Sequence, residues 1–230
     1  MCDPPFMTAE FFIADDTPTA EVLRREKVVA ALTESVRGLV DATIRSTVGD
    51  EEILAVRDEV DALVERLRAA QIPGPAGVRF NTEGHSWSWG NAVVGQRNAI
   101  APPLEIVHDV PAGRAHAEVT LGAAYEGPPG LVHGGISALL LDQIMGETAS
   151  GFRRVTMTGT LTVRYRRGTP LGRLRVESWI ARESERKVTV DAHLLGPDGR
   201  PTVEATGLFI VPSWALGDQP EAAPKKSAEG

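Results

Sequence analysis

A glycine pair followed by a lone aspartate is the feature of this sequence best suited to chemistry. Gly134 and Gly135 come directly after His133, at the start of an apolar run, and Asp142 interrupts that run eight residues after Gly134. The N–H groups at the start of a helix have no partners inside it, and glycine lets a ligand oxygen approach them closely. Such a turn can hold a carbonyl that becomes an oxyanion, while a carboxylate can activate water.

The apolar run predicts a buried helix over 134–150, with apolar residues on all of its sides. Aspartate is a poor residue for a helix interior, and an ionised carboxylate is costly to bury without partners. Asp142 must therefore either bond to neighbours or face a cavity. Two structural alternatives stay open: an aspartate that only bonds to a neighbouring strand, and a glycine pair that only forms a tight turn into the helix.

One substrate carbonyl group cannot easily lie close to both groups within one chain. With a rise of about 1.5 Å per residue, Gly134 and Asp142 lie roughly 12 Å apart along the helix axis. If two copies of the helix run antiparallel across a two-fold axis, Gly134 of one chain can approach Asp142 of the other. We therefore expect a homodimer with two equivalent sites.

Two helices are predicted ahead of this region. Thr17 is expected to cap the first, with Pro18 in its first turn and Gly49 closing it. Asp50 is expected to cap the second. An apolar seam with alternating spacings of three and four follows, formed by Ile53, Val56, Val60, Leu63, Leu67 and Ala70. Residues 17–72 are thus predicted to form a helical hairpin, whose expected role is packing or support of a dimer.

Strands are predicted on both sides of the apolar helix. Residues 78–112 are expected to be irregular, and the alternating Trp87 and Trp89 either line an acyl pocket or, as we favour, fill the edge of a core. Short links between the later strands imply an antiparallel meander, with a hairpin turn at 196–199. An antiparallel sheet with one apolar helix is an α+β arrangement. The predicted strands are 114–122, 155–167, 172–184, 187–196 and 200–211.

The same residues resemble a known family. "GPPGLVHGG" at 127–135, the following "LLD" and "TMTGTLTVRYRRGTPLG" at 156–172 resemble the PaaI-like acyl-CoA thioesterases of the 4-hydroxybenzoyl-CoA thioesterase-like superfamily. The resemblance covers residues 115–211, and none is claimed for 1–77. It implies a hotdog fold, in which an antiparallel sheet wraps around a central helix, and a dimer or a dimer of dimers.

The resemblance also implies a mechanism. Gly134 would polarise the thioester carbonyl through its N–H, and Asp142 of the partner chain would act as general base on water or as nucleophile. Thr158 stands where relatives keep a serine or threonine that orients the water or the carboxylate. His133 would support the loop or the thioester sulfur. Alternatively, Thr158 is one of several alternating strand threonines, and His133 is a hydrogen-bonded loop residue.

One position departs from the family pattern. Many relatives place an asparagine six residues before the histidine, where this chain has Gly127. The water-holding role of that asparagine must then be filled otherwise or be missing. Gly127 and Gly135 are expected to contact substrate, and this form of the loop looks closest to relatives that act on medium or long acyl chains.

Composition limits the possible partners. The chain has 230 residues and a net charge of −7, which argues against general nucleic-acid binding. Residues 153–187 carry 10 basic and 3 acidic side chains, which we interpret as a solvated strand face, with contact to an anionic ligand as the alternative. Cys2 is the single cysteine, and no apolar run reaches the length of a membrane span. We expect no signal peptide and a cytoplasmic location.

The sequence lacks the motifs of several other classes of enzyme. There is no GxSxG, HExxH, P-loop or paired cysteine, and the five histidines lack ligand spacing, so no metal or cofactor is expected. The main prediction is an acyl-CoA thioesterase, with a hotdog hydratase or dehydratase and a non-catalytic acyl-CoA binding protein as alternatives. The predicted parts are a leader and hairpin at 1–77, a hotdog domain at 78–212 and a disordered tail at 213–230.

Overall fold

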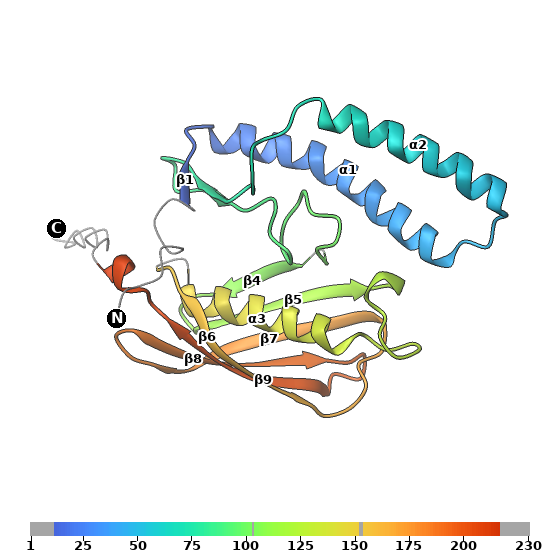
Figure 1. The fold of residues 1–230 in the computed structure, drawn as a ribbon. Coiled ribbons are helices and arrows are strands. Elements are labelled where there is room, and N and C mark those ends of the chain that lie inside the picture. The colour runs from blue at the N-terminus through green and yellow to red at the C-terminus, as the bar shows by residue number, and fades with distance from the viewer. Residues whose placement is uncertain (1–11, 103, 152–153, 217–230) are drawn as a thin grey trace, which may run out of the picture. The chain divides into compact units, whose positions relative to one another are not determined.

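A computed structural model describes residues 12–102, 104–151 and 154–216 (Figure 1). The chain forms two compact units. The first holds the described residues up to Glu105, together with Val119–His133 and Pro170–Arg173. The second holds Ile106–Glu118, Gly134–Thr169 and the described residues from Leu174 onward. The predicted domain boundary between residues 77 and 78 stays a prediction, and the predicted tail lies largely outside the described residues.

Two long helices, α1 (Thr19–Arg45) and α2 (Asp50–Arg68), form the predicted hairpin in the first unit (Figure 1). Their caps differ from the prediction. The Thr17 hydroxyl donates to Asp15 Oδ1 at 2.6 Å instead of capping α1, which starts after Pro18. Gly49 occupies the cap position of α2 rather than closing α1, and Asp50 is the first residue of α2.

The hairpin buries little of its surface. Only Val22 and Thr33 of α1 are buried, and no residue of α2 is. Ala70, the last residue of the predicted seam, lies beyond the end of α2. The apolar seam of α2 is therefore left uncovered by the part of the chain that the structure describes.

Short strands occupy part of the region predicted to be irregular. β1 (Phe12–Ala14) pairs in parallel with β2 (Val78–Phe80), which pairs antiparallel with β3 (Ser86–Trp87). Because these strands are only two or three residues long, their alternation is too brief to be recognised in the sequence. Trp87 is buried and Trp89 is half-buried, and both also line a pocket of the first unit, so the two interpretations of this pair stay open.

A six-stranded sheet in the order β4-β5-β7-β8-β9-β6 carries the predicted long strands (Figure 1). All five are found, with ends within two residues of those predicted, and β4 was missed. Only β7, β8 and β9 form the expected meander, because β6 lies at the far edge beside β9. The strands are β4 (Glu105–Asp109), β5 (Arg114–Leu121), β6 (Met157–Tyr165), β7 (Gly172–Glu183), β8 (Lys187–Leu195) and β9 (Pro201–Ile210).

Helix α3 (Gly134–Ser150) lies against this sheet and packs on β6, β8 and β9. Leu140, Leu141, Ile144 and Met145 are fully buried, and each contributes about 1.5–3 kcal/mol of hydrophobic stabilisation. The α+β hotdog fold is therefore confirmed. The helix is not buried on all sides as predicted, however, because the face that carries Asp142 is only half-buried. None of the described helices is long and apolar enough to cross a membrane.

Candidate active site

The first candidate group is the amide at the start of α3. The helix begins at Gly134, directly after His133 in the chain. The N–H of a first helical residue has no acceptor within the helix, and the helix dipole adds positive potential at this end. Gly134 is half-buried. Its amide can therefore donate a hydrogen bond to a carbonyl oxygen or an oxyanion.

Tyr165, the last residue of β6, forms a hydrogen bond to the first residue of this helix. Its hydroxyl donates a hydrogen bond of 2.9 Å to the Gly134 carbonyl oxygen. A Cβ on residue 134 would lie 3.3 Å from Cε1 of the tyrosine ring, tighter than ordinary van der Waals contact. A side chain at position 134 would therefore make the exposed tyrosine ring shift by a few tenths of an ångström. The sequence carried no signal for Tyr165, because its role depends on how β6 packs against the helix.

The second candidate group is the carboxylate of Asp142. The Thr158 hydroxyl, from β6, donates a hydrogen bond of 2.9 Å to its Oδ1. Asp142 is half-buried, so the cost of desolvating a carboxylate is met partly by water and partly by this bond. The contact fits a carboxylate positioned for catalysis, and it equally fits the structural alternative of an aspartate bonded to a strand.

A β-bulge places Thr158 outside the ordinary alternation of its strand. Thr158 pairs with Phe209 and Thr160 pairs with Leu208, so the register between β6 and β9 shifts at Gly159. Bulges change the direction of a side chain relative to a regular strand. Thr158 is therefore not simply one of several equivalent strand threonines, although the bulge could not be recognised in the sequence.

The glycine-rich loop ahead of α3 is closed by main-chain bonds within the first unit. Gly127 N–H donates to Leu131 O at 2.9 Å, and His133 N–H donates to Tyr125 O at 2.9 Å. A Cβ on residue 127 would lie only 2.7 Å from the His133 Cα. Because that neighbour is backbone, the loop admits no side chain at position 127, which accounts for the missing asparagine.

The predicted site residues thus fall into two groups. Within the second unit, Asp142 contacts Thr158, and Gly134 contacts Tyr165. His133 and Gly127 meet within the first unit, and the histidine is exposed, as is Gly135 at the second position of α3. The catalytic and substrate-binding roles remain predictions for the whole set: Gly127, His133, Gly134, Gly135, Asp142 and Thr158.

Two arginines that follow β6 are neutralised by ion pairs. Arg166 pairs with Glu204, and Arg167 pairs with Asp198, each at 2.6 Å. The guanidinium of Arg167 and the main-chain N–H of residue 200 hold the pKa of the Asp198 carboxyl well below its usual range. These pairs agree with the interpretation of a solvated strand face. Among the described residues, no three His, Cys, Asp or Glu side chains cluster as metal ligands.

Comparison with known proteins places the site in a family context. The family model of the thioesterase superfamily matches residues 129–202. Acyl-coenzyme A thioesterase THEM4 of Xenopus laevis is 36% identical over 91 residues, which are 39% of this chain and 41% of that protein. The chain thus matches less than half the length of this curated relative.

Solved structures extend the comparison beyond the sheet. The Escherichia coli PaaI protein is 15% identical, with a TM-score of 0.45 over 48% of this chain and 80% of that one. A crystal structure of a thioesterase superfamily protein is 32% identical, with a TM-score of 0.70 over 79% of this chain and 90% of that one. With this identity over almost the whole of a solved member, the chain belongs to the thioesterase superfamily, as the resemblance predicted.

Proposed function

We propose that this chain hydrolyses acyl-CoA thioesters to a free acid and CoA. The observation that carries the proposal is the pairing of Thr158 with Asp142 on the helix whose first residue is Gly134. One helix then supplies both a hydrogen-bonded carboxylate and a half-buried amide at its first residue. Membership of the thioesterase superfamily, and the acyl-CoA thioesterase named among the relatives, support this reaction.

The site is completed by a second copy of the chain. Within one α3, Gly134 and Asp142 are eight residues and so about 12 Å apart along the axis. β6 is an edge strand of nine residues, most of them exposed, and it packs beside α3. Long exposed edges are usually covered, and antiparallel pairing of two such edges gives a two-fold dimer. Such a dimer can bring Gly134 of one copy to Asp142 of the other.

The reaction balances with water as the only co-reactant. Gly134 N–H donates to the thioester carbonyl, and Asp142 takes a proton from the water that attacks the carbonyl carbon. The tetrahedral intermediate places its negative oxygen at the same N–H. The C–S bond then breaks, and the CoA sulfur takes up the proton. In the alternative route, Asp142 attacks the carbon itself, and water hydrolyses the resulting mixed anhydride.

Three further points belong to the proposal. The acyl group is of medium or long chain, the protein is a homodimer or a dimer of dimers, and it works in the cytoplasm. They rest on the resemblance and on the composition of the sequence. The loop at Gly127 supplies no asparagine side chain, so Thr158 is the residue placed to orient the attacking water or the carboxylate.

A panel of acyl-CoA substrates with a free-thiol readout tests this function. Thiol release that depends on Asp142 supports hydrolysis. Hydration of enoyl-CoA without thiol release would instead indicate a hydratase. Tight acyl-CoA binding without turnover would indicate a binding protein. Either of the last two results overturns the proposal.

A further inference from the structure

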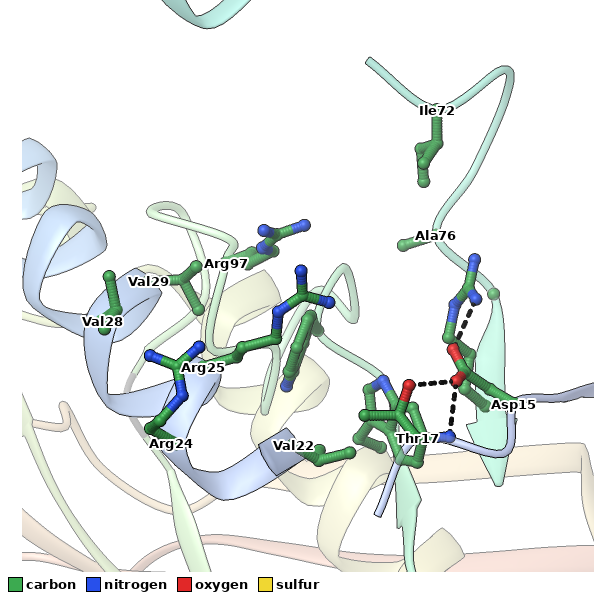
Figure 2. A pocket seen from close by; sticks show the side chains of 14 residues that line it. Asp15, Thr17, Val22, Arg24, Arg25, Val28, Val29, Ile72, Ala76 and Arg97 are labelled. Atoms are coloured by element: carbon green, nitrogen blue, oxygen red, sulfur yellow. Dashed lines mark hydrogen bonds and ion pairs between the residues drawn. The ribbon is translucent and has the colours of Figure 1, made fainter. Parts of the chain in front are cut away.

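A pocket of about 470 Å³ lies wholly within the first unit, and no residue of the proposed mechanism lines it. Its walls come from the start of α1, from β2 and from loops near residues 72–77 and 87–97 (Figure 2). Four of the residues that line it are arginines, and one is an aspartate: Arg24, Arg25, Arg79, Arg97 and Asp15. This cationic lining is notable because residues 1–70 carry 8 basic against 15 acidic side chains.

Two of these arginines are already neutralised. Arg79 Nη1 lies 2.8 Å from Asp15 Oδ2. Arg24 makes two hydrogen bonds to Glu21, at 2.7 and 2.8 Å. The Arg79–Asp15 pair joins β2 to the segment ahead of α1, whereas the Arg24–Glu21 pair lies within α1. Both pairs leave little charge for a ligand.

The other two arginines of the pocket, Arg25 and Arg97, keep positive charge available for a ligand. Among the carboxylates that the structure describes, Arg25 approaches only that of Glu21, at 3.5 Å, and Arg24 already binds both oxygens of that carboxylate. Arg97 has no carboxylate within ion-pair distance among the described residues, and its guanidinium lies over the Trp89 ring at 4.9 Å. Two available guanidinium groups in one pocket favour a group with two negative charges, such as phosphate, over a single carboxylate.

The rest of the pocket offers flat and apolar surface. Val22, Val28, Val29 and Trp87 line it. The Trp89 indole is held in place because its Nε1–H donates to Glu26 at 3.1 Å. The volume is within the range of about 300–1,000 Å³ that is usual for small-molecule sites. A ligand here should therefore combine phosphate groups with a flat, largely apolar part.

We propose that this pocket binds the phosphates and base of a nucleotide. Free nucleotides and the nucleotide portion of CoA share this chemistry, and both are candidates. The proposal does not depend on thioester hydrolysis, because none of the lining residues takes part in it. Arg25 and Arg97 would contact phosphate oxygens. The side chains with accessible surface that would contact the base are those of Val28, Val29 and Trp89.

Calorimetric titration of the full chain with ADP, CoA, adenosine and pyrophosphate tests this, with no thioester present. The variants are Arg25→Gln and Arg97→Gln. Arg57→Gln is the control, because Arg57 lies on α2 outside the pocket and is 61% exposed, as Arg25 is. We expect each pocket variant to weaken nucleotide binding about tenfold, the effect of losing one charge-assisted hydrogen bond, and the control to bind normally.

The ligands separate the possible sources. ADP binding equal to or tighter than CoA binding assigns the site to free nucleotides, and preference for CoA assigns it to the nucleotide portion of CoA. Adenosine that binds as well as ADP would show that phosphate is not recognised and would overturn the proposal. So would the absence of binding by both nucleotides, or equal weakening in the control variant. None of these results bears on thiol release.

A second and independent observation concerns the uncovered seam of α2. Its apolar residues repeat at alternating spacings of three and four, the pattern of a helix that packs along another helix. No residue of α2 is buried, and Ile53, Val56, Leu63 and Leu67 are 37–56% exposed. The seam therefore has no cover within the described residues.

The apolar seam of α2 can pack against the same seam of a second copy that runs in the opposite direction. In an antiparallel register, Val56 faces Leu67 of a second copy and Val60 faces Leu63 of the second copy, and two-fold symmetry repeats each pair. Residues 50–59 carry five acidic side chains and one basic, whereas 60–68 carry two of each. Antiparallel pairing sets the acidic half against the neutral half and brings Glu59 near Arg66 of the second copy. Parallel pairing would set the two acidic halves together.

We infer that α2 packs antiparallel against α2 of a second copy of this chain. Disulfide trapping tests the register. Two differently tagged chains, both carrying Cys2→Ser, are co-expressed with Val60→Cys in one and Leu63→Cys in the other. We expect a disulfide that joins the two tags. A control pair replaces Val60→Cys by Leu54→Cys, because Leu54 is off the seam and, at 51%, as exposed as Leu63. No disulfide, or equal yield in the control pair, would overturn the inference.

Discussion

The Thr158 hydroxyl donates a 2.9 Å hydrogen bond to Asp142 Oδ1, and a bulge in β6 directs it there. If this bond orients the carboxylate for catalysis, Thr158→Val should lower kcat about tenfold, because it removes the donor and keeps the shape. Thr158→Ser should retain most of the activity. Steady-state kinetics on an acyl-CoA substrate measure both.

The control for this change is Thr162→Val, on the same strand beyond the bulge. Thr162 is exposed and pairs with Thr206 rather than lying beside the bulge. The Thr162→Val substitution should therefore leave kcat unchanged. If Thr158→Val also leaves kcat unchanged, the hydroxyl is only a structural contact.

The parts of this fold that periodicity encodes could be predicted. The helix over 134–150 was predicted with its observed ends, and the five long strands were placed within two residues. Both depend on apolar patterns that repeat over many residues. The position of β6 at the edge of the sheet could not be predicted, because it is set by packing against α3 and not by the length of a link.

The sequence was enough to name the candidate site residues, whose catalytic roles stay predictions, but it did not predict their local geometry. The spacing of Gly134 and Asp142 in the sequence predicts that a second chain completes the site, and this stays a prediction. The bulge at Gly159, the hydrogen bond from Tyr165 and the crowding at Gly127 were not predictable. Each depends on contacts between residues distant in sequence or on a close approach of backbone, which leave no periodic signal.

Asp142→Asn should lower kcat at least about a hundredfold, since asparagine keeps the size of the side chain and removes the base or nucleophile. Asparagine can still accept the bond from Thr158, so the fold and the dimer should persist. Kinetics and light scattering on the same preparation test both expectations. Turnover near that of the natural chain would rule the mechanism out.

Restoring the family's asparagine at position 127 should damage the loop. A Cβ there lies 2.7 Å from the His133 Cα, so Gly127→Asn should destabilise the protein by about 1–3 kcal/mol through overpacking. Gly38→Ala, in the middle of α1 with nothing within 4 Å of its new Cβ, should instead stabilise it by about 0.5–1 kcal/mol. Thermal melting measures both. Equal melting temperatures for Gly127→Asn and the natural chain would contradict the geometry.

Glu147, on α3, should make stability depend on pH. Burial raises the pKa of its carboxyl above the ordinary value, although a hydrogen bond from Gln143 opposes this. His108 Nε2 lies 3.8 Å away, but burial lowers the pKa of that ring and favours its neutral form. Protonated Glu147 therefore suits the folded state. The stabilisation that protonated Glu147 gives the folded state is fully present below the pKa that its carboxyl has in the unfolded chain. It is lost as the pH rises through the higher pKa that this carboxyl has in the folded protein.

Glu147→Gln should consequently melt at a higher temperature than the natural chain near pH 8, and this difference should shrink toward zero by about pH 4. Scanning calorimetry across this range measures the difference. Glu185→Gln, in the exposed turn after β7, serves as the control and should show no such trend. A pH-independent difference for Glu147→Gln would mean that its burial does not disfavour the charged form.

Mixed dimers distinguish a shared site from one within a single chain. Gly134→Pro removes the proposed N–H donor, and proline is well tolerated at the first position of a helix. Its ring must displace the exposed Tyr165 side chain slightly. The Gly134→Pro and Asp142→Asn proteins should each be nearly inactive. When they are refolded together in equal amounts, half of the dimers are mixed, and each mixed dimer has one site with both groups intact. About a quarter of the natural activity should return. If each site lay within one chain, no site in the mixture would hold both groups, and no activity would return.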